Sequence, residues 1–321
     1  MQRRRRGDDF TANYRKALQP AFDRQVDLVV HGGDMFFRSR VHPAIVEAAF
    51  EPLLHIADQG IPVFIVPGNH ERSNIPRSLL QSHANILIFD RPRTHLLNLN
   101  GCRISLAGFP NVRHDPRTQF KAQLEKTGWK SFEADIRLLC MHQTVEGAQV
   151  GVQNYTFRGG PEVIRGADIP AGFDAILSGH LHRYQVLRRD LTGRPLNAPV
   201  FYPGSTERTS FAEREEEKGY LVMKIRAGEA MEHVFTPLPA RPMVDLVITG
   251  QGFTIEQIRE KLIQQISQSD ENAVVRVHLK EGESGAWISV LNDRWLRSVA
   301  PATMNISWVY NWRRGGDESS S

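Results

Sequence analysis

Short apolar stretches alternate with amphipathic ones over the first two thirds of the chain. Residues 26–30 and 63–66 are apolar runs of strand length, and residues 43–57 between them have a helical pattern. A strand, a helix and a second strand in this order predict a βαβ unit with parallel strands. An earlier helix, capped by Asp8 or Asp9, is predicted from apolar residues four positions apart. These are Phe10, Tyr14, Leu18 and Phe22.

The same pattern continues to about residue 177 and then changes. Further strands are predicted at residues 86–89, 103–107, 136–141 and 174–177, and a helix is predicted over residues 116–126. The next strands are predicted at residues 184–189, 200–202 and 219–225, without helices between them. Such a run favours antiparallel pairing, because antiparallel neighbours need only short connections. The predicted fold class is therefore α/β, with two facing mixed β-sheets flanked by helices.

A proline-rich linker at residues 237–242 precedes a region with its own β-α-β pattern. Strands are predicted at residues 244–249 and 275–279, and Thr254 with Gln257 forms a capping box at the start of the helix between them. The apolar stripe of that helix is Ile255, Ile258, Leu262 and Ile266. We predict a large domain at residues 1–236, a small α+β domain at residues 243–312 and a disordered tail at residues 313–321.

Composition and charge narrow the classes of protein only slightly. With 40% hydrophobic and 24% charged residues, the chain of 321 residues is typical of a globular protein. Its net charge of +4 permits a nucleic-acid partner without requiring one. The two cysteines, Cys102 and Cys140, suggest neither a disulfide framework nor a thiolate metal site, so we expect a cytoplasmic protein. No apolar run reaches the roughly 18 residues of a membrane span.

Four of the predicted strands are followed at once by side chains that bind metals. The segments contain Asp34, Asn69-His70, His142 and His180-Leu181-His182. Carboxylate, amide and imidazole groups suit divalent manganese, iron or zinc, and alternate residues of an extended segment point the same way. Taken singly, Asp34 fits a turn or a helix cap better than a metal site, Asn69-His70 fits a turn better, and His142 fits a hydrogen-bonded structural histidine better. Together they predict a metal site, approached closely by backbone at Gly33, Gly68 and Gly179.

These segments resemble the motifs of the calcineurin-like metallophosphoesterases. The matching stretches are Gly33-Asp34, Gly68-Asn69-His70-Glu71, His142 and Gly179-His180-Leu181-His182. Within that superfamily, residues 202–211 and 216–220 are similar to the SbcD-type DNA repair exonucleases, the bacterial relatives of the meiotic recombination eleven nuclease. The resemblance implies a four-layer α/β/β/α domain, and it implies that the small domain is a DNA-capping domain.

The resemblance also implies roles for single residues. It implies a centre of two metals, usually Mn²⁺ with Mg²⁺, Fe²⁺ or Zn²⁺ possible, in which Asp34 bridges both ions. Asn69, His142 and His180 would complete one site, and His182 would contribute to the other. His70 would be catalytic, acting on the phosphate or the leaving oxygen. Ser205 and Arg208 would contact substrate. The implied partners are DNA ends, a coiled-coil ATPase of the SbcC type and a second copy of the chain.

Two features depart from the family pattern. The family begins with an Asp-x-His motif on its first strand, but this sequence has no histidine before His31. Asp8 and Asp9 are poor substitutes, because they are predicted to cap a helix. We therefore expect the first strand to be missing, through a misplaced start or a truncation, and one metal site to be incomplete. The second departure is Phe37, which replaces a histidine found in some branches of the family.

Three functions remain open from the sequence. The leading hypothesis is a nuclease that cleaves DNA phosphodiesters by two-metal activation of water. The second is a phosphoesterase acting on small phosphodiesters or phosphoproteins, against which the appended domain argues. The third is a non-catalytic subunit that binds DNA or the ATPase, because one metal site is incomplete.

Overall fold

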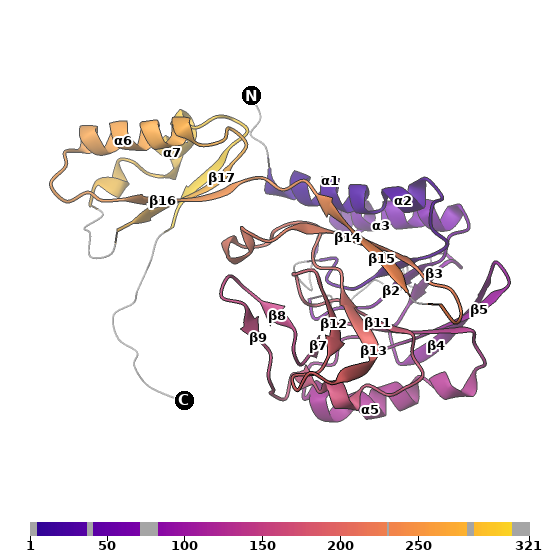
Figure 1. The fold of residues 1–321 in the computed structure, drawn as a ribbon. Helices are drawn as coiled ribbons and strands as arrows, with labels where there is room; N and C mark the ends of the chain where they lie inside the picture. The colour runs from indigo at the N-terminus through magenta and orange to yellow at the C-terminus, as the bar shows by residue number, and fades with distance from the viewer. Residues whose placement is uncertain (1–4, 37–40, 71–82, 230, 281–285, 310–321) are drawn as a thin grey trace. The chain divides into compact units, whose positions relative to one another are not determined.

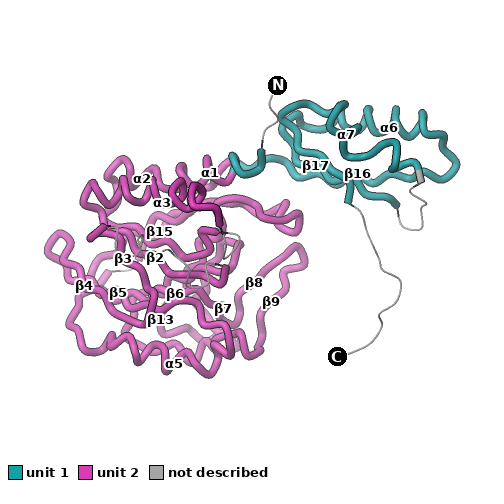
Figure 2. Tube along the Cα trace, turned by 180° about the vertical axis from the view of Figure 1, so that it is seen from behind, with its two compact units in different colours: residues 1–9, 240–321 teal, residues 10–239 magenta. Residues whose placement is uncertain are grey.

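The computed structural model describes residues 5–36, 41–70, 83–229, 231–280 and 286–309. It divides into two compact units, a larger one of residues 10–239 and a smaller one of residues 1–9 with 240–321 (Figure 2). The division falls between Pro239 and Ala240, inside the predicted proline-rich linker. The predicted tail at residues 313–321 and the first four residues lie outside the described ranges.

A three-stranded parallel sheet of the larger unit contains the predicted βαβ unit. Its strands are β1 (Val29–His31), β2 (Val63–Ile65) and β3 (Ile86–Ile88), in that order. The helix α3 (Pro43–Asp58) connects β1 to β2, and Val30 pairs with Phe64 in parallel register. The predicted strands at residues 63–66 and 86–89 are thus confirmed, whereas β1 begins three residues later than predicted.

A second sheet has six strands and mixed directions. Its order is β12 (Gln185–Arg189), β13 (Pro195–Tyr202), β11 (Ala175–Ser178), β6 (Ile136–Met141), β5 (Cys102–Gly108) and β4 (Arg93–Leu99). The four inner strands are parallel, and the outer strands β4 and β12 are antiparallel to their neighbours. The sequence pattern missed β4, because its polar residues Arg93, Thr94 and Asn98 hide the apolar alternation of an edge strand.

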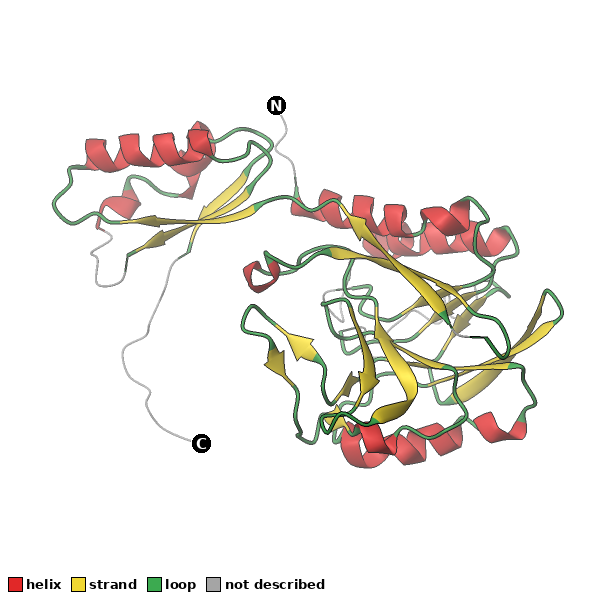
Figure 3. Ribbon diagram, viewed as in Figure 1, coloured by secondary structure: helices red, strands yellow, loops and turns green. Residues whose placement is uncertain are grey.

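Side-chain alternation along the strands places the two sheets face to face. Phe64 and Val66 from the β2 segment share a buried cluster with Leu138 and Cys140 of β6. The opposite face of β2 packs with Phe50 and other residues of α3. The opposite face of β6 packs with α5 (Pro116–Lys126). Helices, sheet, sheet and helix therefore form successive layers, with α2 and α3 on one side and α5 on the other (Figures 1 and 3). The predicted α/β fold class, two facing sheets flanked by helices, is confirmed.

The rest of the larger unit consists of short elements around the sheets. The strands β14 (Lys218–Lys224) and β15 (Glu232–Leu238) form an antiparallel pair. The smaller pairs are β7 (Thr144–Val145) with β10 (Val163–Ile164), in parallel, and β8 (Gln149–Val150) with β9 (Tyr155–Thr156), antiparallel. Three 3-10 turns are η1 (Trp129–Ser131), η2 (Gly166–Asp168) and η3 (Phe211–Glu213).

The N-terminal helical segment differs from the prediction at its start. It consists of α1 (Arg6–Ala17) and α2 (Gln19–Phe22). Asp8 and Asp9 lie inside the first turn rather than at the cap, so that prediction was wrong, although Asp8 still accepts a hydrogen bond from the Arg5 amide. Of the predicted apolar stripe, Leu18 is buried and Phe10 is exposed.

The smaller unit is a parallel three-stranded sheet with helices between the strands. Its elements are β16 (Met243–Ile248), α6 (Ile255–Gln268), β17 (Val274–Leu279), η4 (Ala286–Ser289), α7 (Asp293–Val299) and β18 (Asn305–Trp308). The capping box of Thr254 and Gln257 is confirmed. Ile258, Leu262 and Ile266 of the predicted stripe are buried, while Ile255 is exposed.

Neither described cysteine is in a disulfide, and burial raises the pKa of the Cys140 thiol to about 12. Within the described ranges, none of the helices combines the length and the apolar character needed to cross a bilayer.

Candidate metal centre

Each predicted ligand segment follows a strand that has a parallel neighbour. Asp34 follows β1 and Asn69 follows β2, and these two strands are paired in the three-stranded sheet. His142 follows β6 directly, and His180 follows β11, the parallel neighbour of β6 in the six-stranded sheet. Since the carboxyl ends of parallel neighbours lie at one edge of a sheet, two adjacent strands of each sheet deliver the four side chains.

The four side chains meet, and we call them the Asp34 cluster: Asp34, Asn69, His142 and His180. The Nε2 atom of His142 lies 3.1 Å from Asp34 Oδ2 and 3.1 Å from Asn69 Oδ1. Nδ1 of His180 lies 3.0 Å from the same Asn69 oxygen. Ligand atoms of Asp34, His142 and His180 all lie within 4.8 Å of one another. The sequence pattern therefore identified side chains that the fold brings together.

The ring of His142 is fixed by a backbone carbonyl. Its Nδ1 lies 2.6 Å from Gly32 O and donates a proton to that oxygen. A ring that carries only this one proton has its lone pair on Nε2, which faces the oxygens of Asp34 and Asn69. Three acceptor atoms converge there, and they need either a proton or a cation between them. The imidazole of His142 is buried, and the Asp34 side chain is half-buried.

Glycine is required where the backbone passes this cluster. A Cβ atom on Gly33 would lie 2.6 Å from His142 Nδ1, and one on Gly179 would lie 2.8 Å from the same atom. A Cβ atom on Gly68 would overlap the Asp34 carboxylate. The prediction that these three glycines mark close approach is confirmed.

Two residues of the cluster have a backbone conformation that is unusual for residues with a side chain. Asp34 has φ of 54° and His180 has φ of 79°. Non-glycine residues in the left-handed region cost about 1 kcal/mol or more, and such strain concentrates at functional sites. Here the left-handed conformation occurs shortly after β1 and β11, where the side chains of Asp34 and His180 enter the cluster.

The electrostatics of the cluster favour the ligand forms of its side chains. Burial alone would raise the pKa of Asp34, but the hydrogen bond and charge of His142 and the contacts with His70 outweigh it and lower that pKa. Burial, together with the neighbouring His142, lowers the pKa of His180 to about 4. An ionised carboxylate beside a neutral imidazole is the set of protonation states that a divalent cation binds.

His70 lies beside the cluster and stays accessible. Its backbone amide donates to Asp34 Oδ1 at 3.0 Å, and its ring Nε2 is 4.0 Å from Asp34 Oδ2. The side chain is 45% exposed. Asp34 therefore holds the backbone of His70 while the ring faces solvent at the edge of the cluster.

His182 is not a member of the group formed by Asp34, His142 and His180. Its Nδ1 lies 2.9 Å from Glu213 Oε1, and its side chain is 40% exposed. The predicted substrate contacts, Ser205 and Arg208, lie in the loop before Glu213. Ser205 Oγ donates to Glu207 O, and Arg208 Nε donates to Glu216 O. Their predicted roles stay predictions, and Phe37 and Glu71 lie outside the described residues.

The family assignment is decided by a match that contains the whole cluster. The family model of calcineurin-like phosphoesterases matches residues 7–184, more than half of the 321 residues. The chain belongs to this family. A phosphoesterase of this family binds divalent metal, and within the described ranges the Asp34 cluster brings together side chains of the types that could hold one.

Two curated relatives of this phosphoesterase are DNA double-strand break repair proteins. The chain is 26% identical to Mre11 of Archaeoglobus fulgidus over 304 residues, which cover 87% of this chain and 65% of that protein. It is 24% identical to Mre11 of Thermoplasma acidophilum over 271 residues, which cover 80% of this chain and 66% of that protein. The chain thus spans slightly less than two thirds of the length of these relatives. Among solved structures, a hypothetical protein from Thermus thermophilus is similar with a TM-score of 0.42 and 12% identity. The match covers 71% of this chain and 94% of that one.

The donor set of the phosphoesterase fits a divalent cation. The Asp34 cluster offers one carboxylate oxygen, one amide oxygen and two imidazole nitrogens. Mixed oxygen and imidazole ligands suit manganese, iron or zinc better than a soft metal such as Cu(I). The Nδ1 bond of His142 to Gly32 is of the kind that fixes the tautomer of histidines in metal sites.

Sequence reasoning missed the residues that support the cluster from β5. Asn111 Nδ2 donates to His142 O at 2.8 Å, and Arg113 Nη2 donates to Asn69 O at 3.0 Å. Both follow β5, the neighbour of β6. The rule that revealed the ligands, polar residues directly after a strand, would have pointed to them too.

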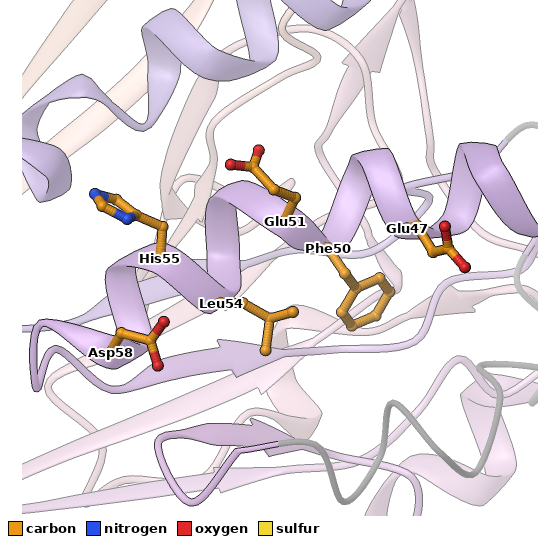
Figure 4. Close-up of a pocket in the computed structure, with 6 residues that line it drawn as sticks. All are labelled: Glu47, Phe50, Glu51, Leu54, His55 and Asp58. Atoms are coloured by element: carbon orange, nitrogen blue, oxygen red, sulfur yellow. The ribbon is translucent and has the colours of Figure 1, made fainter.

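A shallow concavity elsewhere on the larger unit does not coincide with the cluster. It runs along one face of α3 and is lined by Glu47, Phe50, Glu51, Leu54, His55 and Asp58 (Figure 4). Glu51 is paired with Arg15 at 2.6 Å. None of the predicted site residues lines it, so we place the functional site at the Asp34 cluster.

Proposed function

We propose that this protein is a metal-dependent nuclease that hydrolyses DNA phosphodiester bonds at double-strand breaks, with Mn²⁺ as its preferred metal. The observation that carries the proposal is the Asp34 cluster, a compact set of oxygen and imidazole donors inside a phosphoesterase domain. The names of the relatives, DNA double-strand break repair proteins, support DNA as the substrate.

Asp34, Asn69, His142 and His180 would hold the cation. A divalent cation supplies Lewis acidity toward a phosphate oxygen and lowers the pKa of water. The chain's part is to fix these donors: Gly32 orients His142, and the His70 amide orients Asp34. The His70 ring, exposed beside Asp34, would donate a proton to the phosphate or to the leaving oxygen.

The finer features of the proposal come from the resemblance. Asp34 would contribute to holding a second cation as well as the first, and His182 would help to hold the second one. Ser205 and Arg208 would contact the DNA backbone. The small unit would act as a DNA-capping domain. A coiled-coil ATPase would be the partner, the chain would form a homodimer, and the complex would act in the cytoplasm.

The test is cleavage of end-labelled linear DNA by the purified chain in the presence of Mn²⁺. We expect cleavage that EDTA abolishes and that Asp34→Asn removes, with much slower turnover of bis-p-nitrophenyl phosphate. Turnover of the small diester without DNA cleavage would instead support a general phosphodiesterase. Tight binding of Mn²⁺ with no turnover of either substrate would support a non-catalytic subunit and overturn the nuclease proposal.

A further inference from the structure

A carboxylate outside the Asp34 cluster holds the ring of His182. Oε1 of Glu213 lies 2.9 Å from His182 Nδ1 and 2.6 Å from the Thr209 hydroxyl. The Thr209 hydroxyl is itself 3.2 Å from His182 Nδ1. Oε2, the other oxygen of Glu213, accepts from the Thr209 amide at 3.1 Å and from Lys218 Nζ at 2.8 Å. Both carboxylate oxygens are therefore occupied by hydrogen bonds.

Lys218 connects this carboxylate to the backbone of His182. The side chain of Lys218 is 0% exposed, and its Nζ donates to His182 O at 2.8 Å, to Glu213 Oε2 at 2.8 Å and to Glu216 Oε2 at 2.9 Å. An ammonium has three protons to donate, so the buried charge is fully satisfied. One lysine thus fixes the main chain of His182 and also the group that binds its ring.

The charges in this buried network balance. Glu216 also accepts from Arg183 Nε at 3.0 Å, so two carboxylates meet two cations. Oε2 of Glu213 faces the Thr209 amide and the Lys218 ammonium, which can only donate, so the geometry fits the ionised carboxylate. An ionised carboxylate only accepts hydrogen bonds, so the ring nitrogen that faces it must carry a proton.

We propose that Glu213, held by Lys218, is a positioning residue that keeps the proton of neutral His182 on Nδ1 and so leaves Nε2 as the ligand nitrogen for a divalent cation. This inference rests on the proposed function, in which His182 binds a cation. A carboxylate behind a metal-binding histidine fixes its tautomer and raises its basicity. Glu213 has no role in the sequence-based prediction, because it lies 31 residues from His182 in the chain.

The variant Glu213→Gln gives a sharp expectation. Oε2 of Glu213 faces Lys218 Nζ and the Thr209 amide. Both groups can only donate hydrogen bonds, so an acceptor atom must stay at this position in the variant. The glutamine carbonyl is therefore expected there, which places its NH₂ group against His182 Nδ1. That NH₂ group donates, so the neutral ring must accept at Nδ1 and carry its proton on Nε2. The substitution should reverse the tautomer and block the ligand nitrogen.

Glu216→Gln is the matched control. It removes the same charge from the same buried network, since Glu216 bonds Lys218 and Arg183. Glu216 makes no described contact with the His182 ring, so this variant should leave the His182 tautomer unchanged. Both substitutions should lower the melting temperature by similar amounts. If Glu213 positions the His182 ring, only Glu213→Gln should also change the His182 tautomer and the affinity for Mn²⁺.

The first experiment reads the tautomer without metal. Nitrogen NMR of the full chain, with ¹⁵N-labelled histidine and His182→Gln for assignment, distinguishes a protonated from an unprotonated ring nitrogen. We expect a protonated Nδ1 in the wild type and in Glu216→Gln, and a protonated Nε2 in Glu213→Gln. A wild-type ring protonated on Nε2 would overturn the proposal, and this result is decisive even if Glu213→Gln does not fold.

The second experiment measures Mn²⁺ binding by titration calorimetry. We expect Glu213→Gln to weaken one Mn²⁺ site about 10- to 100-fold and Glu216→Gln to bind within about twofold of the wild type. Equal affinities in all three proteins would overturn the role of Glu213 in cation binding. A wild type that binds no Mn²⁺ would instead overturn the proposed function, while the NMR result would still decide how Glu213 acts on His182.

Discussion

The Nε2 atom of His142 lies 3.1 Å from the amide oxygen of Asn69, although the two residues are 73 positions apart in the chain. His142 follows a strand of the six-stranded sheet and Asn69 follows a strand of the three-stranded sheet. This contact joins the edges of the two sheets, and it depends on their packing through Phe64, Leu138 and Cys140. The Asp34 cluster is therefore a property of the paired sheets rather than of either one.

Asn69→Ala should abolish tight Mn²⁺ binding with little loss of stability. The amide oxygen faces both His142 and His180, so its removal takes one donor from the cluster. Loss of outer partners alone weakens metal sites about 10- to 100-fold, and loss of a ligand should cost at least as much. Titration calorimetry checks this, with the exposed Asn98→Ala as control. Unchanged affinity in Asn69→Ala would remove Asn69 from the ligand set.

His70→Ser should separate binding from turnover. Its backbone amide, which orients Asp34, is retained, so the affinity for Mn²⁺ should stay close to that of the wild type. Loss of a general acid lowers kcat by about 10²- to 10⁴-fold. Mn²⁺ affinity and DNA cleavage measured on the same preparation test both halves of this prediction. Wild-type turnover would show that the ring has no part in the reaction.

Gly179→Ala should destabilise the protein and disturb the cluster. The added Cβ would lie 2.8 Å from His142 Nδ1 and overlap the carbonyl of Gly32. Overpacking of this kind costs about 1–3 kcal/mol. Thermal unfolding compares it with Gly7→Ala, which adds a Cβ into open space on α1 and should be neutral or slightly stabilising. Equal melting temperatures for both variants would contradict the close approach at Gly179.

The smaller unit should lose stability in acid through Asp245. Burial alone would raise the pKa of Asp245, but hydrogen bonds from Arg276 and His278 outweigh it and lower that pKa. The distances are 2.9 Å to Arg276 and 2.8 Å to His278. A lowered pKa means that the stabilisation is complete above the ordinary value of about 3.9. It is lost as the pH falls from there through the folded-state pKa.

Urea unfolding of the full chain between about pH 7 and pH 2 measures this effect. Asp245→Asn should be less stable than the wild type at neutral pH, and the gap should close in the acid range. Glu260→Gln, which alters an exposed acid on α6, controls for charge alone. A gap between Asp245→Asn and the wild type that stays constant with pH would contradict the assignment to ionised Asp245.

Local patterns predicted much of the secondary structure. The helix at Pro116–Lys126 and the strand at Ile136–Met141 have the predicted bounds. Each element contains its own signal, a proline at the first helical position in one and an apolar run in the other. The strands β4, β15 and β18 were not predicted. The polar or exposed residues of β4 and β15 obscure the alternation, although each pairs in a hairpin with the strand next to it in the chain. β18 has only 4 residues, and its partner β17 lies before α7 in the chain.

The sequence by itself predicted which side chains could bind a metal, because each lies shortly after a predicted strand and its position along the chain is local information. Only the tertiary structure decided which of them meet. Asp34, Asn69, His142 and His180 converge because two sheets pack face to face. His182, two residues from His180, instead bonds Glu213, and a buried Lys218 holds both. Side-chain direction at a strand end depends on backbone angles and on neighbours far away in sequence, and no local pattern encodes these.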